Sequence, residues 1–397
     1  PVIIVTRSLS PSDTLMMPKN FVMGLATEVG GKTSHVGIFA AALGIPAVTG
    51  IKEITSNINS GDPIIIDGID GEIIPSPSDK QFNHYLKKQE NYRLYEERLL
   101  TNIHQPAETL DGKQVKLLAN IETNQEVKTL HKFGAEGIGL YRTEFLYLTS
   151  SFLPGERELY KNFKLAAQEM NSQPVVIRTL DIGMDKQIGN ISSSNEDNPA
   201  LGLRGIRLSL TKTDLLTNQF KGILRASLYG NIKILYPMIS SVTEIIQANK
   251  ILDNVKNDLR NDQVPFNEKI EVGAMIETPA AAICIDHILK EVDFVSIGTN
   301  DLIQYLLAVD RINENVAHLY QPFHPSVLRT LKSIIEATQK AGKKVSICGE
   351  LGGDPMATML LLGLGKIDDL SMEPHAIPKV KKIIRTIRIE DAQKLAN

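Results

Sequence analysis

The feature that most constrains the fold of this chain is an alternation of short apolar β-rich runs with longer helical patterns, which begins near Leu110. The eight runs are Val115–Ile121, Gly137–Tyr141, Val175–Leu180, Ile232–Met238, Ile270–Glu277, Phe294–Thr299, Lys344–Gly349 and Asp368–Met372. Near-continuous apolar runs are typical of strands that are buried on both faces of a parallel sheet. Eight such strands predict a (β/α)8 TIM barrel. A doubly wound open sheet has the same periodicity and stays open as an alternative.

The segment before Leu110 does not show this alternation. Short β-type runs lie at Val2–Val5, Ala47–Thr49, Ile64–Asp67 and Glu72–Ile74, around one helix-like stretch at Ser34–Leu43. A polar stretch over 78–101 then predicts a solvated helix with one weak apolar face. We therefore expect a small α/β domain over residues 1–77, a linker helix over 78–108 and the barrel over 109–397.

Composition narrows the class of protein. A length of 397 residues suits two domains, and a formal net charge of −3 argues against a general nucleic-acid binder. The two cysteines, Cys284 and Cys348, are too few for a disulfide framework and have no zinc-binding spacing. The sequence also has no apolar run of transmembrane length and no signal-peptide pattern. We expect a cytoplasmic protein without a membrane or nucleic-acid partner.

Charged side chains fall at the ends of the predicted strands. In a (β/α)8 barrel the C-terminal strand ends meet at one face, which is where active sites lie. Guanidinium groups match phosphate and carboxylate oxygens in pairs. The candidates for such an anion clamp are Arg142, Arg178, Arg204 and Arg311. Each arginine taken singly is more often a surface or ion-pair residue.

Other strand ends carry different chemistry. Glu277 and Asp301 supply the oxygen ligands that Mg²⁺ prefers. Cys348 lies at the end of another run, and a thiol there can act as a general acid. Taken singly, these carboxylates read as helix N-caps and the cysteine as a small buried hydrophobe. Their joint placement at strand ends favours a catalytic site that stabilises negative charge.

The strongest local motif is Gly-Gly-Lys-Thr-Ser-His-Val-Gly-Ile at 30–38. The two glycines permit a tight turn, and Thr33 or Ser34 can cap the helix that follows. His35 then falls in the first helical turn, where free amides and the helix dipole favour a phosphate on the imidazole. On this stretch alone, a capped helix with a surface histidine is the commoner interpretation.

Together these motifs closely resemble Enzyme I of the bacterial phosphoenolpyruvate-dependent phosphotransferase system, the phosphoenolpyruvate–protein phosphotransferase. The matching segments are residues 30–35, 134–146, 178–183, 198–207, 277–281, 296–302 and 348–351. The resemblance implies that phosphoenolpyruvate phosphorylates His35 at Nε2 and is converted to pyruvate, with Cys348 protonating the enolate. It implies Mg²⁺ as cofactor, held by Glu277 and Asp301. The implied substrate-binding residues are Arg142, Arg178, Lys186, Arg204, Asn300 and Arg311.

The resemblance also sets expectations about partners. Family members pass the phosphoryl group to the carrier protein HPr and dimerise through the barrel. The helical domain that docks HPr has no counterpart in this sequence, which begins at Pro1 inside the phosphohistidine domain. We therefore expect a fragment whose swivelling domain, residues 1–77, is incomplete at its N-terminus. The sugar-uptake and nitrogen-related branches of the system both stay open.

Two rival functions remain at this point. Pyruvate phosphate dikinase and phosphoenolpyruvate synthase share both domain types but also need an ATP-grasp domain, which the sequence does not show. A regulatory module that binds phosphoenolpyruvate without turnover is the rival from another class. The complete set of catalytic motifs argues against that module.

Overall fold

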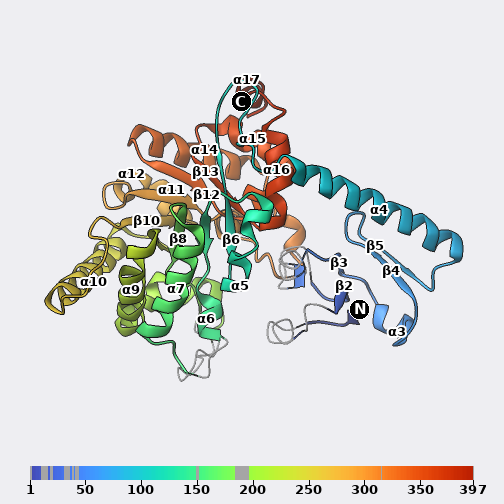
Figure 1. Cartoon of the computed structure of the whole chain (residues 1–397), viewed down its shortest axis with the longest axis horizontal. Coiled ribbons are helices and arrows are strands. Elements are labelled where there is room, and N and C mark those ends of the chain that lie inside the picture. Colours follow the sequence, from blue (N-terminus) through green and yellow to red (C-terminus); the bar gives the residue numbers. More distant parts are fainter. Residues whose placement is uncertain are drawn as a thin grey trace. The chain divides into compact units, whose positions relative to one another are not determined.

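The computed structural model describes residues 2–9, 17, 21–30, 36–37, 40, 44–148, 152–183, 196–313 and 315–396 (Figure 1). His35, most of the predicted helix around it, and Lys186 lie outside these residues. The chain forms two compact units. The first comprises Pro1–Asn102 with Leu307–Gln321, and the second comprises Ile103–Leu306 with Pro322–Asn397. Each unit is described by itself.

The second unit contains a closed barrel of eight parallel strands. In chain order they are β6 (Lys116–Ile121), β7 (Ile138–Tyr141), β8 (Pro174–Arg178), β9 (Asn231–Tyr236), β10 (Glu271–Ile276), β11 (Phe294–Ile297), β12 (Lys344–Ile347) and β13 (Asp369–Met372). Each strand pairs with the next, and β13 pairs with β6 to close the ring. The predicted (β/α)8 barrel is confirmed, and the open sheet is excluded because the ring has no edge.

Helices alternate with these strands along the chain (Figure 1). They are α5 (Asn124–Val127), α6 (Glu144–Leu148), α7 (Glu156–Met170), α8 (Ile206–Thr211), α9 (Thr213–Ala226), α10 (Val242–Asn261), α11 (Pro279–Ile283), α12 (Ile285–Ile288), α13 (Thr299–Leu307), α14 (Pro325–Lys340), α15 (Pro355–Leu364), α16 (Ile377–Ile384) and α17 (Ile389–Ala396). The buried residues of α7 include Leu159, Phe163, Ala166 and Met170, which recur every three to four positions. That spacing produces one apolar face, which packs inward while the polar face stays in solvent.

The strands are buried on both sides, as their sequence predicts. Leu117, Ile138, Val175, Ile234 and Val345 are all fully buried between the strands and the surrounding helices. Burying such side chains contributes about 1.5–3 kcal/mol each. Because every strand ends in a buried ring, the residues just after the strand ends are held on a rigid frame.

The first unit contains a parallel sheet of β1 (Val2–Thr6), β2 (Val22–Thr27) and β3 (Ala47–Thr49), together with the hairpin β4 (Ile64–Asp67) and β5 (Glu72–Pro75). The short helix α3 covers Ile54–Asn57. The sequence reading missed β2, because Met23 and Gly24 weaken its β pattern. Gly24 lies close to a neighbouring loop, since a Cβ atom there would lie 3.3 Å from the carbonyl oxygen of Pro46, which is a tight contact.

The long helix α4 spans Asp79–Thr101 and confirms the predicted solvated helix. It starts with a capping box, in which Ser78 accepts from the backbone of Gln81 and Gln81 bonds back to Ser78. None of its residues is buried. No helix in the described ranges is long and apolar enough to cross a membrane.

Candidate active site

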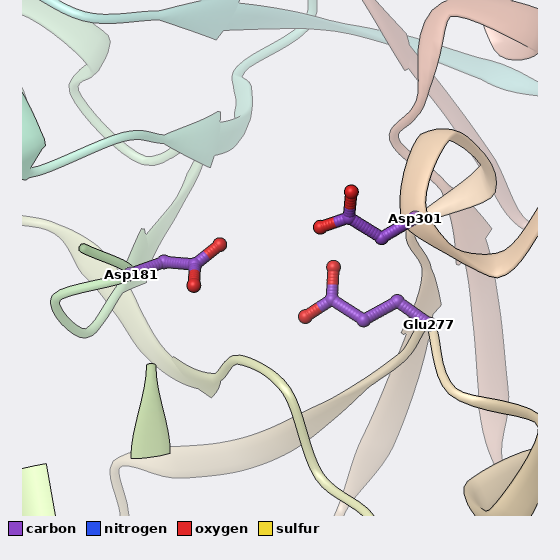
Figure 2. A group of neighbouring side chains, drawn as sticks. All are labelled: Asp181, Glu277 and Asp301. Atoms are coloured by element: carbon purple, nitrogen blue, oxygen red, sulfur yellow. The ribbon is translucent and has the colours of Figure 1, made fainter. Parts of the chain in front are cut away.

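Three carboxylates from three strand ends face one another in the barrel (Figure 2). Asp181 comes shortly after β8, Glu277 directly after β10, and Asp301 lies in the first turn of α13, after β11. One oxygen of each lies within 4.8 Å of the other two. All three are nearly closed to solvent: the Asp181 side chain is 3% exposed, and the Glu277 and Asp301 residues are 1% and 7% exposed. We call these residues the carboxylate triad.

Two arginines supply counter-charge to the triad. Arg178, the last residue of β8, places Nη1 3.0 Å from Asp181 Oδ2 and Nη2 3.1 Å from Glu144 Oε1. Arg204 places Nη2 3.0 Å from Oδ2 of both Asp181 and Asp301. Within this cluster four carboxylates face two guanidinium groups, so the negative charge is in excess.

The excess shows in the titration of Glu277. Burial, with the nearby charges of Asp181 and Asp301, raises the pKa of Glu277 to about 8, although Arg178 and Arg204 oppose the shift. Glu277 Oε1 also accepts a hydrogen bond from the backbone of Met238 at 2.5 Å. Buried oxygen ligands with surplus negative charge form the donor set that a hard divalent cation prefers. The residues present therefore fit a Mg²⁺ ion.

Arg142 lies at the neighbouring strand end, directly after β7. Its Nη1 lies 3.2 Å from Glu122 Oε1 and 3.4 Å from Glu373 Oε1. Burial raises the pKa of Glu373 to about 7, and Arg142 lowers it only in part. Arg178 has a further donor, because its buried Nε makes no hydrogen bond to any described residue. Buried donors are normally paired, so this Nε is available to an incoming acceptor.

Cys348 follows β12 and is 1% exposed. Burial raises the pKa of its thiol to about 11, a hydrogen bond from Ser296 lowers it, and the charge of Glu277 raises it. The Sγ atom lies 3.6 Å from the carbonyl oxygen of Ile297, to which the thiol donates. At neutral pH the group is therefore a protonated thiol that can give up a proton.

Asn300 lies in the first turn of α13, and Arg311 follows that helix in the sequence. Asn300 donates from Nδ2 to Glu350 Oε1 at 3.0 Å and accepts from the Glu350 backbone at 2.9 Å. Arg311 is half-buried in the segment Leu307–Gln321, which belongs to the first compact unit.

The structure brings several predicted residues together. Arg178, Arg204, Glu277 and Asp301 share one cluster. Arg142, Asn300 and Cys348 lie at the adjacent strand ends. His35 and Lys186 lie outside the described residues, and Arg311 belongs to the other unit. The roles of all these residues stay predictions.

Sequence reasoning did not select Asp181 or Glu373 as site residues. Asp181 is the centre of the ion-pair network, because it contacts both Arg178 and Arg204. Glu373 directly follows the last barrel strand. Both carry the signal that singled out Glu277, namely a carboxylate just beyond a strand end. Applying that rule to all eight strands would have found them.

Comparison with known proteins places the chain in a family. Residues 96–389 match the family described as PEP-utilising enzyme, PEP-binding domain, and residues 1–71 match PEP-utilising enzyme, mobile domain. The phosphoenolpyruvate-protein phosphotransferase of Geobacillus stearothermophilus is 45% identical over 394 residues, which is 99% of this chain and 68% of that protein. The protein of that name from Buchnera aphidicola subsp. Baizongia pistaciae (strain Bp) is 45% identical over 396 residues, 100% of this chain and 69% of that protein.

Solved structures similar to this chain include one of Enzyme I. An NMR solution structure of Enzyme I shares 45% identity over 23% of this chain and 37% of that chain, with a TM-score of 0.22. The extent of the sequence matches is what decides the assignment, because they cover both units. With its closed barrel and both family segments, this chain belongs to the PEP-utilising enzymes, in the family of the phosphoenolpyruvate-protein phosphotransferases.

Proposed function

We propose that this chain transfers the phosphoryl group of phosphoenolpyruvate to His35 and releases pyruvate. The observation that carries the proposal is the carboxylate triad with Arg178 and Arg204 at the C-terminal end of the barrel. Relatives that match nearly the whole chain bear the name of this activity. Phosphoryl transfer needs positioning and charge stabilisation more than covalent chemistry, and charged groups on a rigid frame supply both.

Glu277 and Asp301 are the proposed Mg²⁺ ligands, and Asp181 lies close enough to be a third. A bound Mg²⁺ would supply positive charge where the phosphoryl group departs and the enolate oxygen develops. Glu277 supports the assignment, because the elevated pKa of its buried carboxyl marks a site with uncompensated negative charge. A divalent ion offsets that charge and favours the ionised carboxylate.

The phosphate and carboxylate of phosphoenolpyruvate require several hydrogen-bond donors, most of them cationic. We assign this role to the cations Arg142, Arg178, Lys186, Arg204 and Arg311 and to the neutral amide of Asn300. Arg178 has the clearest support, because its buried Nε has no acceptor among the described residues while Asp181 and Glu144 hold the rest of the guanidinium. A guanidinium fixed in this way presents its remaining donor without loss of side-chain entropy.

Cys348 is the proposed acid. When the phosphoryl group leaves, the enolate of pyruvate remains, and its methylene carbon must gain a proton. The Cys348 S–H bond breaks as the C–H bond forms, which leaves a thiolate. The elevated pKa of the buried thiol suits this role, since it keeps the proton in place until a strongly basic carbon is present.

The remaining features of the proposal concern the whole molecule. We propose that residues 1–77 form the swivelling domain that carries His35, and that residues 78–108 form a linker about which it moves relative to the barrel, residues 109–397. We also propose a cytoplasmic homodimer that associates through the barrel and delivers phosphate to an HPr-type carrier. The two free cysteines suit a reducing compartment.

The test is transfer of radiolabel from phosphoenolpyruvate to the purified chain with Mg²⁺. We expect labelled wild-type protein and pyruvate in equal amounts, no label in His35→Ala, and wild-type label in His84→Ala, which alters an exposed histidine of α4. Equal labelling of wild type and His35→Ala would show that the acceptor is wrong. Pyruvate formation by Cys348→Ala at the wild-type rate would remove the cysteine from the mechanism.

A further inference from the structure

One side of the barrel interior is polar. Ser296 of β11, Ser346 of β12, Ser371 of β13 and Asn120 of β6 are all buried. The remaining strands fill the interior with a cluster that includes Leu140, Val176, Leu235 and Met275. Barrel interiors are dominated by bulky branched side chains, so a line of small hydroxyl groups on consecutive strands is unusual.

Two of these hydroxyl groups form a chain that ends at the thiol of Cys348. Ser296 and Ser346 face each other in the register of β11 and β12. The Ser346 hydroxyl donates to Ser296 Oγ at 2.9 Å. Cys348 lies next to this pair, because its backbone N–H at 3.1 Å and its thiol at 3.6 Å both donate to the carbonyl oxygen of Ile297, the neighbour of Ser296 in β11. The Ser296 hydroxyl acts on the sulfur, since it lowers the pKa of the thiol. With Ser346 as the donor to Ser296, the hydroxyl proton of Ser296 is left for the sulfur, and this is the orientation that delivers a proton to it.

The serine pair reaches a cavity of about 330 Å³ at the N-terminal end of the barrel, on the side away from Cys348. The cavity is lined by residues near the strand starts, among them Lys233, Lys344 and Asp369, and by Ser346. It is large enough for several water molecules, since each occupies ~30 Å³. Cys348 is not among its lining residues. The serine pair therefore bridges the gap between the cavity and the sulfur.

Asp369 lies where the serine pair meets the cavity. It faces Ser346 in the register of β12 and β13 and lines the same cavity. Burial and the charge of Asp368 raise the pKa of Asp369 to about 6, while Lys116, Lys233 and Lys344 lower it. A carboxyl group that titrates close to neutral pH exchanges protons readily with water in the cavity.

We propose that Ser346 and Ser296 return a proton to Cys348 from the N-terminal end of the barrel, away from the substrate side. This inference rests on the proposed function, in which the thiol gives its proton to the enolate. The resulting thiolate takes the Ser296 hydroxyl proton, Ser296 takes that of Ser346, and Ser346 takes one from cavity water. One solvent proton is consumed for each pyruvate formed, and both serines end as hydroxyls. Ser296 and Ser346 act as relay residues that do not touch the substrate.

The alternative route is direct. Once pyruvate has left, water from the substrate side could reprotonate the sulfur. In the structure Cys348 is 1% exposed, so its sulfur has little direct contact with solvent. The two routes differ in one observable, because only the relay depends on the serine hydroxyls.

The test uses the exchange of ¹³C-labelled pyruvate into phosphoenolpyruvate in D₂O, with Mg²⁺ and the complete chain. Carbon exchange needs no solvent proton, because the thiolate removes a proton from pyruvate and returns it in the next forward reaction. Deuterium enters the pyruvate methyl group only when the thiol exchanges with solvent. The ratio of deuterium incorporation to carbon exchange, followed by NMR and mass spectrometry, therefore reports on the relay alone.

We expect Ser296→Ala and Ser346→Ala to lower this ratio by roughly tenfold or more while carbon exchange persists. Ser296→Thr keeps a hydroxyl and should restore the ratio. Ser371→Ala, which removes a buried hydroxyl bonded to Asn120, is the matched control and should leave the ratio unchanged. A merely structural effect would lower both rates together.

Three results would overturn the inference. The first is a wild-type ratio in both alanine variants, which would place the proton source on the substrate side. The second is a parallel loss of both rates in both variants, which would indicate a structural role. The third is an equal fall of the ratio in Ser371→Ala. Failure of the proposed function looks different, because wild-type protein would then show no carbon exchange at all.

Discussion

Replacing Asp181 with asparagine tests the charge balance of the site most directly. The substitution keeps the shape of the side chain but removes one negative charge from the triad. Two attractive contacts are lost, to Arg178 and Arg204, each at 3.0 Å. Above about pH 8, where Glu277 is ionised, two repulsive contacts, to Glu277 and Asp301 within 4.8 Å, are lost as well. The stability of the variant depends on which pair of terms is larger.

The distances allow an order-of-magnitude answer. With an effective dielectric constant of ~20, an attraction at 3.0 Å is worth ~5.5 kcal/mol, and a repulsion at the limiting separation of 4.8 Å is worth ~3.5 kcal/mol and more at shorter range. Losing two of each costs at most about 4 kcal/mol, and hydrogen bonds retained by the amide recover about 1 kcal/mol. We therefore expect a net loss of up to about 3 kcal/mol. Removing one partner of a buried pair typically costs this much or more.

Urea denaturation without metal at about pH 9, above the pKa of Glu277, measures the free energy of unfolding of Asp181→Asn against wild type. Asp286→Asn, at a side chain that is 69% exposed, is the control and should change stability by less than about 0.5 kcal/mol. Saturating Mg²⁺ should stabilise wild type more than Asp181→Asn, since binding to the folded state adds RT ln(1 + [L]/Kd). A variant as stable as Asp286→Asn would refute the reasoning, because repulsion within the triad would then outweigh the arginine pairs.

Three further substitutions test other parts of the structure. Glu373 has a pKa raised from 4.5 to about 7, so its stabilising contribution is full below pH ~4.5 and is lost as the pH rises through 7. At ~1.4 kcal/mol per pH unit, the free energy of unfolding of Glu373→Gln should rise by about 3 kcal/mol relative to that of wild type between pH 4.5 and 7.5. Urea titrations measure this difference, and a difference that does not change with pH would contradict the prediction. Gly139→Ala should destabilise by about 1–3 kcal/mol, because its Cβ would lie 2.4 Å from Ser371 Oγ, whereas Gly155→Ala has open space and should be neutral in the same thermal melts. Ser78→Ala should cost about 1 kcal/mol at the start of α4, seen as faster amide exchange confined to that turn.

Much of the barrel could be predicted from the sequence because the information is local. The eight apolar runs match the eight strands to within two residues at each end, for example Val115–Ile121 against Lys116–Ile121. Such runs are dictated by burial on both faces, which every strand of a closed parallel barrel shares. The strand β2 was not predicted, because the reason for its glycine is not local. Gly24 allows the strand to approach Pro46, and a contact between residues so far apart in the sequence cannot be seen in the local pattern.

The candidate site also has a part that the sequence predicts and a part that only the tertiary structure reveals. Sequence alone identified the residue types at strand ends, and the family motifs around Arg178, Glu277, Asp301 and Cys348 made the chemistry recognisable. Only the tertiary structure showed that Asp181 joins the triad and that Ser296 and Ser346 pair inside the barrel. The physical reason is that a pKa, an ion pair and a proton path depend on distances between groups far apart in the chain. Closure of the barrel sets those distances, and no local pattern encodes them.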